Sequence, residues 1–294
     1  MNKVIFSVVA FLLKLISLLP FWLLYLLSDL LFFFIYYIFK YRRNVVQINL
    51  ANAFPGKSSE ERTDIERRFY SFLADMIVES IKSISITQKE LTERYQFENL
   101  EAIKKHLNAG RSVIAVSGHY GNWEWGPLGI VLELDCDILV VYKPLSDKKF
   151  DHLINSIRSR FGTIMIPMKQ TLRKVAEYKN KPHVLVLVGD QTPTRDESQY
   201  FTNFLNQPTA VFLGVEKIAV KTNNPIIYFS IKRIKRGYYK SVVKELINNP
   251  KDCAEYEITD AHTRELEDLI REMPDYWLWS HKRWKFKPED IKND

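Results

Sequence analysis

The sequence predicts an α/β fold in which a mostly parallel central sheet is flanked by helices. An N-terminal hydrophobic membrane helix or helical hairpin precedes it. Short apolar runs rich in β-branched residues alternate with segments of helical periodicity, and residues 4–39 are almost entirely apolar or aromatic. The 294 residues, 46% of them hydrophobic, can bury one sizeable core. We therefore expect a membrane anchor at residues 1–41 and one domain at residues 42–294.

The N-terminal segment is a membrane element by its length and composition. Residues 15–39 carry a single charge, Asp29, and exceed the roughly 20 residues that cross a bilayer. No small-residue cleavage site follows, so we interpret the segment as retained rather than as a removed signal peptide. Lys14, Pro20 and Asp29 fit poorly in the centre of one straight spanning helix. Both a span and an interfacial pair of apolar helices, hinged near Pro20, therefore remain open.

Basic residues follow the apolar segment and dominate the overall charge. Lys40, Arg42 and Arg43 end the segment, and such flanks favour the cytoplasmic side of a membrane. The formal net charge of +7 and the pI near 9.1 indicate attraction to polyanions, either anionic lipid head groups or nucleic acid. Charge alone does not choose between these two partners.

Helical and strand patterns alternate after the anchor. Ser58 is a candidate N-cap before acidic residues, and apolar residues then recur at helical spacing through residue 81. Near-continuous apolar runs predict strands that are covered on both faces, as in a parallel sheet. The predicted strands lie at residues 112–117, 137–142, 163–166, 183–189 and 225–230.

Several common sites are excluded by their missing motifs. Gly56-Lys57-Ser58 lacks the glycine and the preceding strand of a phosphate-binding loop, so it is a helix-capping loop. Dinucleotide, serine-hydrolase and zincin motifs are absent from the sequence. Cys136 and Cys253 have no neighbours at metal-ligand spacing. We expect no metal and no cofactor.

The strongest chemical pattern follows the strand at residues 112–117. A polar, glycine-rich stretch at 118–126 carries His119 and Glu124 and precedes Pro127, and sites gather at the carboxyl ends of such strands. Because Pro127 is tolerated only near a helix start, the next helix should begin around residues 124–126. In one continuous helix the two side chains would point about 140° apart, whereas a turn followed by a helix can bring them together.

A histidine beside a carboxylate suits the activation of a hydroxyl. His119 would take the hydroxyl proton, and Glu124 would fix its tautomer and stabilise the imidazolium. The structural alternative is a histidine at a helix start beside a first-turn acid that favours the helix dipole. Spacing alone favours this alternative.

These residues resemble a known family. The stretch from Ser117 to Glu124 is similar to the His-x4-acid signature of the lipid A late acyltransferases, the lauroyl and myristoyl transferases, and of the related phosphatidylinositol mannoside acyltransferases. The resemblance covers nearly the whole chain. Its further blocks lie at residues 41–55, 97–100, 142–145, 158–162, 189–191, 204–209 and 273–285.

The resemblance implies a glycerolipid-acyltransferase-like fold and an activity. An acyl chain would move from an acyl carrier protein or coenzyme A thioester to a hydroxyl of a lipid A precursor, on the cytoplasmic face of the cell inner membrane and without a nucleic acid partner. His119 would be the general base, supported by Glu124. A further set of residues would bind the substrate. The structural alternative is that Arg158 lies on a solvated basic face of a helix and that Asp190 caps a turn. The set is Arg158, Asp190, Lys143 and Asn122.

The acceptor is the least determined part of this reading. Residues 192–197 and 204–206 depart from the family pattern where acceptor recognition is plausible. A phospholipid, another glycolipid or an aminolipid is therefore an alternative acceptor. A thioesterase is an alternative activity, because it would use a similar base to activate water. A non-enzymatic membrane-anchored basic module explains the charge but not the polar strand exit. The aromatic and basic cluster at 277–285 is either core or an interface to lipid head groups.

Overall fold

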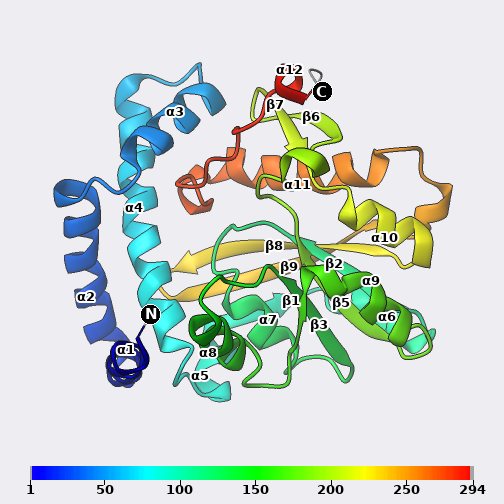
Figure 1. The fold of residues 1–294 in the computed structure, drawn as a ribbon, viewed down its shortest axis with the longest axis horizontal. Helices are drawn as coiled ribbons and strands as arrows, with labels where there is room; N and C mark the ends of the chain where they lie inside the picture. Colours follow the sequence, from blue (N-terminus) through cyan, green and yellow to red (C-terminus); the bar gives the residue numbers. More distant parts are fainter. Residues whose placement is uncertain (1, 292–294) are drawn as a thin grey trace.

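A seven-stranded sheet forms the centre of the computed structural model, which describes residues 2–291. The strand order is β1-β9-β8-β2-β5-β3-β4 (Figure 1). Strands β8, β2, β5, β3 and β4 run parallel to one another, whereas β9 pairs antiparallel with β8 and carries β1 parallel to itself. The strands are β1 (Tyr95–Glu98), β2 (Val113–Ser117), β3 (Asp137–Tyr142), β4 (Ile164–Pro167), β5 (His183–Val188), β8 (Ile226–Lys235) and β9 (Tyr238–Ile247). The predicted mostly parallel sheet is confirmed.

Strand β9 and a second small sheet lie outside the sequence prediction. Strand β9 has pairs of polar residues between its apolar ones, and buried residues alternate with partly exposed ones over residues 238–243, so it lacks the continuous apolar run of the predicted strands. Strands β6 (Tyr200–Phe204) and β7 (Gln207–Val211) form an antiparallel hairpin. Leu205 and Asn206 join them, both with positive φ, as a two-residue primed turn requires.

The central strands are covered on both faces. Ile114 and Val116 of β2 pack into a core shared with α11, whereas Val113 and Ala115 pack on the opposite side with α6 and α7. This alternation follows from the two-residue period of a strand. The helices are α3 (Arg43–Ala53), α4 (Ser59–Lys82), α5 (Gln88–Arg94), α6 (Glu101–Asn108), α7 (Trp125–Ile130), α8 (Lys148–Arg158), α9 (Thr171–Glu177), α10 (Gly214–Thr222), α11 (Glu257–Glu272) and α12 (Pro288–Ile291).

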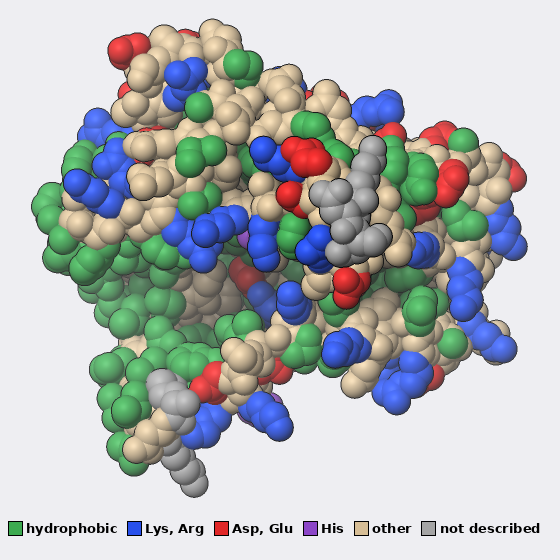
Figure 2. Space-filling view, turned by 45° about the horizontal axis from the view of Figure 1, so that its top comes forward, with side chains coloured by type: hydrophobic (Ala, Val, Ile, Leu, Met, Phe, Trp, Pro, Cys, Tyr) green, Lys and Arg blue, Asp and Glu red, His purple; other side chains and the backbone are tan. Residues whose placement is uncertain are grey.

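The apolar N-terminus folds as two helices that meet at Pro20, an arrangement that the sequence left open. Helix α1 (Lys3–Ser17) is seen end-on in Figure 1, whereas α2 (Phe21–Phe33) runs alongside α4 and continues into a π-helical turn at Phe34–Ile38. Residues Phe21–Ile38 are long and apolar enough to cross a membrane, with a mean hydropathy of 1.9, and only 17% of them are buried. Figure 2 shows hydrophobic side chains covering this side of the molecule around a hollow.

Polar residues of α2 bind α4. Tyr25 Oη donates to Glu79 Oε1 at 2.9 Å, and Ser28 Oγ donates to Asp75 Oδ1 at 2.7 Å. Asp29, which fits poorly in a bilayer by itself, pairs with Arg236 at 2.6 Å, and the same guanidinium binds Asp75 at 2.7 Å. The charge at position 29 thus joins the anchor to the β8–β9 turn.

Asp75 should be a main contributor to stability, because it is 1% exposed and also binds Arg233 at 2.6 Å. Asp75→Asn should lower the free energy of unfolding by about 3 kcal/mol, since the buried Arg233 would lose its charged partner and Arg236 would keep only Asp29. Thermal unfolding in detergent measures this effect. Asp64→Asn, on the exposed face of the same helix, is the matched control. Equal melting temperatures for the two variants would contradict the expectation.

Candidate active site

The carboxyl ends of β2 and β5 bring His119 and Asp190 together. The strands pair in parallel with Ser117 opposite Val188. His119 lies two residues after Ser117 of β2, and Asp190 lies two residues after Val188 of β5. His119 and Asp190, 71 positions apart, therefore meet at one edge of the sheet.

The Asp190 carboxylate makes two hydrogen bonds with His119 and a third with Trp277. Its Oδ1 lies 2.5 Å from His119 Nδ1, and its Oδ2 accepts from the His119 backbone N at 2.9 Å and from Trp277 Nε1 at 2.8 Å. The Asp190 side chain is 5% exposed and that of His119 is 20% exposed. Nδ1 is thereby fixed as the protonated nitrogen, and Nε2 keeps its lone pair for a substrate proton.

The environment tunes the pKa values of both groups. Burial opposes ionisation of Asp190, but the charge and hydrogen bonds of His119, with the Trp277 indole, lower its pKa to about 2. Burial also opposes protonation of His119, but the Asp190 carboxylate outweighs it and raises the His119 pKa above the ordinary 6.5. The pair therefore has a permanently ionised carboxylate and a strengthened base.

Two further side chains border the free nitrogen of His119. Gln191 Nε2 lies 3.2 Å from His119 Nε2, and the Trp123 ring packs edge-on against the imidazole at 5.3 Å between centroids. A substrate hydroxyl that binds Nε2 would take the place of the Gln191 amide. Neither side chain was predicted, although Gln191 belongs to the block at 189–191.

Glu124 does not contact His119 as the sequence analysis expected. It binds Arg158 with two hydrogen bonds, at 2.9 Å to Nε and 2.6 Å to Nη2. The helix begins at Trp125, within the predicted range, and the turn before it brings Glu124 near enough to raise the pKa of His119 by its charge. The residue that orients His119 is Asp190. The sequence analysis did not pair the two residues, because they are 71 positions apart.

Arg158 lies at the end of α8 with its guanidinium turned toward this cluster. Burial disfavours its charge, but the Glu124 carboxylate raises the Arg158 pKa, so the group is cationic. Nη1 has no hydrogen-bond partner among residues 2–291. One donor of a fixed cation is thus available beside the His119–Asp190 pair.

Asn122 and Lys143, the other predicted substrate-binding residues, lie in different settings. Asn122 is 0% exposed, donates to Glu79 Oε2 at 2.7 Å and accepts from the Trp125 backbone N at 2.9 Å. Both its polar groups are satisfied, so it positions the turn and does not face substrate. Lys143 is exposed and directly follows β3, at the sheet edge that carries His119. Its binding role stays a prediction.

The C-terminal segment holds the catalytic turn in place. Gly121 N donates to Tyr276 O at 3.0 Å, and Leu278 N donates to His119 O at 3.1 Å. Gly121 has φ +60, and a Cβ there would lie 2.5 Å from Ile231, so only glycine fits. Trp277 and Trp279 are 1% and 0% exposed, so these two aromatics of the cluster at 277–285 are core and not an interface to lipid.

Comparison with known proteins identifies the family. A model of the family described as bacterial lipid A biosynthesis acyltransferase matches residues 1–286. The chain belongs to this family. It is therefore an acyltransferase, and the resemblance seen in the sequence is confirmed.

Relatives with assigned names are distant but cover most of the chain. The lipid A biosynthesis palmitoleoyltransferase of Escherichia coli (strain K12) is 22% identical over 260 residues, which span 85% of this chain and 80% of that protein. A lipid A biosynthesis acyltransferase of Haemophilus influenzae is 24% identical over 246 residues, or 82% and 74% of the two chains.

The raised pKa of His119 predicts how acyl transfer responds to pH. A base must be neutral, so kcat/KM of the acyltransferase should fall as the pH drops through a value above 6.5. Asp190→Asn removes the carboxylate that favours the imidazolium, so this acidic limb should move to lower pH. The same variant should lower kcat by about 10³-fold or more, because the tautomer of His119 is no longer fixed. An unchanged limb would show that Asp190 does not tune the base.

The guanidinium of Arg158 is tested by Arg158→Lys. Lysine keeps the charge but loses the two-pronged contact with Glu124, so kcat should fall by about 10- to 100-fold. Arg160→Lys is the control, because Arg160 is exposed and donates to the Ser83 carbonyl. Steady-state transfer rates for both variants distinguish a positioned cation from any basic side chain. Equal rates would argue against a specific role for Arg158.

Proposed function

We propose that the protein transfers a fatty acyl chain from a thioester of acyl carrier protein or coenzyme A to a hydroxyl of a lipid A precursor. The observation that carries this proposal is the His119–Asp190 pair, in which Nε2 is the unprotonated nitrogen of a strengthened base. Membership of the family supports lipid A as the acceptor. The names of its relatives support it too.

The reaction follows from the geometry of the pair. His119 Nε2 takes the proton of the acceptor hydroxyl, and the oxygen attacks the thioester carbonyl. The tetrahedral intermediate then collapses with loss of the thiolate, which receives the proton from the imidazolium. The products are an ester and a free thiol.

Glu124 and Arg158 serve this reaction as a unit. The guanidinium, oriented by the two hydrogen bonds that it donates to Glu124, offers Nη1 to the developing oxyanion or to a phosphate of the acceptor. Glu124 therefore acts through Arg158, and Lys143 adds a charge for an anionic substrate at the same sheet edge. No metal is required by this mechanism.

The membrane is the source of the acceptor in this proposal. Residues 1–41 anchor the chain in the cell inner membrane, and the acyltransferase domain at 42–294 works on the cytoplasmic face. The exposed apolar residues of α1 and α2 and the basic cluster at 40–43 support this placement. Phe6 of α1 contacts Phe150 of α8, at 5.4 Å between ring centroids, so the anchor lies beside the helix that bears Arg158. A lipid acceptor would approach along this apolar side.

The largely parallel sheet with a site at its carboxyl edge is consistent with a glycerolipid-acyltransferase-like fold.

The test is transfer of radiolabelled acyl from acyl carrier protein to a tetra-acylated lipid A precursor that bears Kdo sugars. Wild type should give acceptor-dependent product. His119→Ala should lose about 10³-fold or more of kcat and Glu124→Ala about 10- to 100-fold, because each removes part of the charge-handling machinery. His152→Ala, an exposed histidine of α8, should keep wild-type activity as the matched control.

Two results would redirect the proposal. Product formation that does not depend on the acceptor would indicate a thioesterase that uses His119 on water. Inactivity on this acceptor but activity on another membrane lipid would move the function to a phospholipid, glycolipid or aminolipid acyltransferase. Full activity of His119→Ala would contradict the assignment of His119 as the base.

A further inference from the structure

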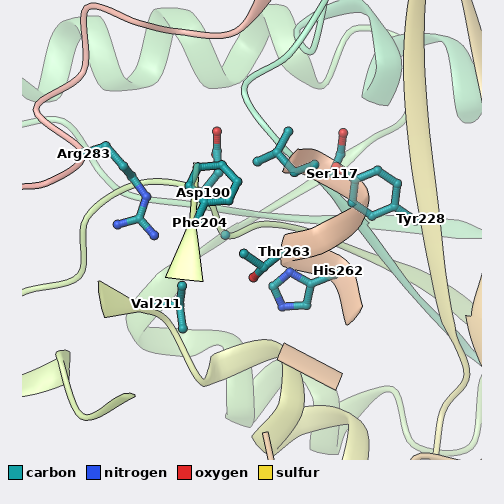
Figure 3. A pocket seen from close by; sticks show the side chains of 10 residues that line it. Ser117, Asp190, Phe204, Val211, Tyr228, His262, Thr263 and Arg283 are labelled. Atoms are coloured by element: carbon teal, nitrogen blue, oxygen red, sulfur yellow. The ribbon is translucent and has the colours of Figure 1, made fainter. Parts of the chain in front are cut away.

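A small cavity borders Asp190 on the inner side of the active site. It measures about 20 Å³ and lies among the ends of β2 and β5, strand β8, helix α11 and the C-terminal segment. Figure 3 shows Tyr228, His262 and Arg283 around it together with Asp190. The residues that contact His119 Nε2 are not part of its lining, so the cavity is separate from the place where the acceptor binds.

Three buried side chains present polar atoms without partners at this cavity. Tyr228, His262 and Arg283 are 1%, 6% and 3% exposed. Tyr228 Oη, His262 Nε2, and Nε and Nη1 of Arg283 have no hydrogen-bond partner within the described part of the chain, residues 2–291. Buried polar groups are nearly always bonded, and a buried guanidinium is especially costly without a partner. Their gathering around one cavity indicates a bound species.

Volume and charge favour water as this species. A cavity of about 20 Å³ accommodates a single water molecule. The negative charge of Asp190 already offsets the positive charge of Arg283, so a further anion would be left uncompensated. Burial lowers the pKa of His262 to about 4, so its ring is neutral at physiological pH and Nε2 can accept. A water molecule can accept from Arg283 and donate to the Asp190 carboxylate.

We propose that an internal water links Arg283 to Asp190 and makes Arg283 a positioning residue for the His119–Asp190 pair. This inference rests on the proposed role of His119 as the base. The buried cation favours the ionised state of Asp190 and opposes accumulation of the imidazolium. Arg283 would thus balance the carboxylate that strengthens the base, so that His119 both takes the proton and releases it to the leaving thiol.

The other charges around the pair do not duplicate this cation. Glu124 and Arg158 neutralise each other as an ion pair. His281, on the same segment as Arg283, accepts from the Thr192 backbone N, and burial lowers its pKa to about 4, so it is neutral. Burial lowers the pKa of Arg283 to about 10, which still leaves it charged at neutral pH. Tyr228 is neutral as well, because burial raises its pKa far above the ordinary value.

The test compares Arg283→Met, which removes the charge, with Arg283→Lys, which keeps it. In the pH dependence of kcat/KM for acyl transfer, Arg283→Met should move the acidic limb to higher pH by about half a pH unit or more, because the imidazolium is no longer opposed. Arg283→Lys should keep the limb at the wild-type position. Loss of activity in both variants with no movement of the limb would reduce Arg283 to a packing role, and wild-type behaviour of Arg283→Met would also overturn the inference.

A second measurement does not depend on turnover. The NMR titration of ¹³C-labelled histidine, with the His119 signal assigned by His119→Gln, should show the same upward shift in Arg283→Met. It tests Arg283 even when wild type fails to acylate the lipid A precursor, so failure of the acceptor and failure of this inference are distinguishable. If Arg283→Met does not fold, a high-resolution crystal structure of the wild type decides. Water density within hydrogen-bond distance of Arg283 and Asp190 is expected, and an empty cavity, a bound anion or a direct contact between the two side chains would refute the bridge.

Discussion

The in-register parallel pairing of β2 with β5 is the constraint on which the active site depends. Because Ser117 lies opposite Val188, the two residues that follow each strand place His119 and Asp190 at one edge of the sheet. The side chains of these strands alternate between two cores. A register shift of one residue would therefore move the side chains of the shifted strand to the wrong face of the sheet. The hydrophobic packing that fixes this register therefore also sets the 2.5 Å contact of the catalytic pair.

Around this pair, each supporting element enters from a distant part of the chain. The C-terminal segment supplies Trp277 to Asp190 and backbone hydrogen bonds to the turn that carries His119. Helix α8 supplies Arg158, which Glu124 orients. Buried tryptophans and short backbone contacts restrict the movement of the turn and so fix the orientation of His119.

The N-terminal helices are joined to the rest of the fold by polar contacts as well as by apolar packing. Tyr25 and Asn122 both donate to the carboxylate of Glu79, one from α2 and the other from the catalytic turn. Burial and the neighbouring Asp75 raise the pKa of Glu79 to about 7. Helix α2 is therefore connected to the turn at 118–124 through the buried side chain of Glu79.

The sequence by itself determined the mostly parallel sheet and the helix start near Trp125, allowed a hinge near Pro20 and singled out His119, because periodicity, chain stiffness and motif spacing are local properties. The predicted partner of that histidine, Glu124, was wrong, and Asn122 was predicted to bind substrate although it is buried. Only the tertiary structure decided that Asp190 orients His119, that Glu124 pairs with Arg158, and that Arg283 lies behind the pair. These contacts join residues far apart in the chain, and strand register and packing, which no local pattern encodes, bring them together.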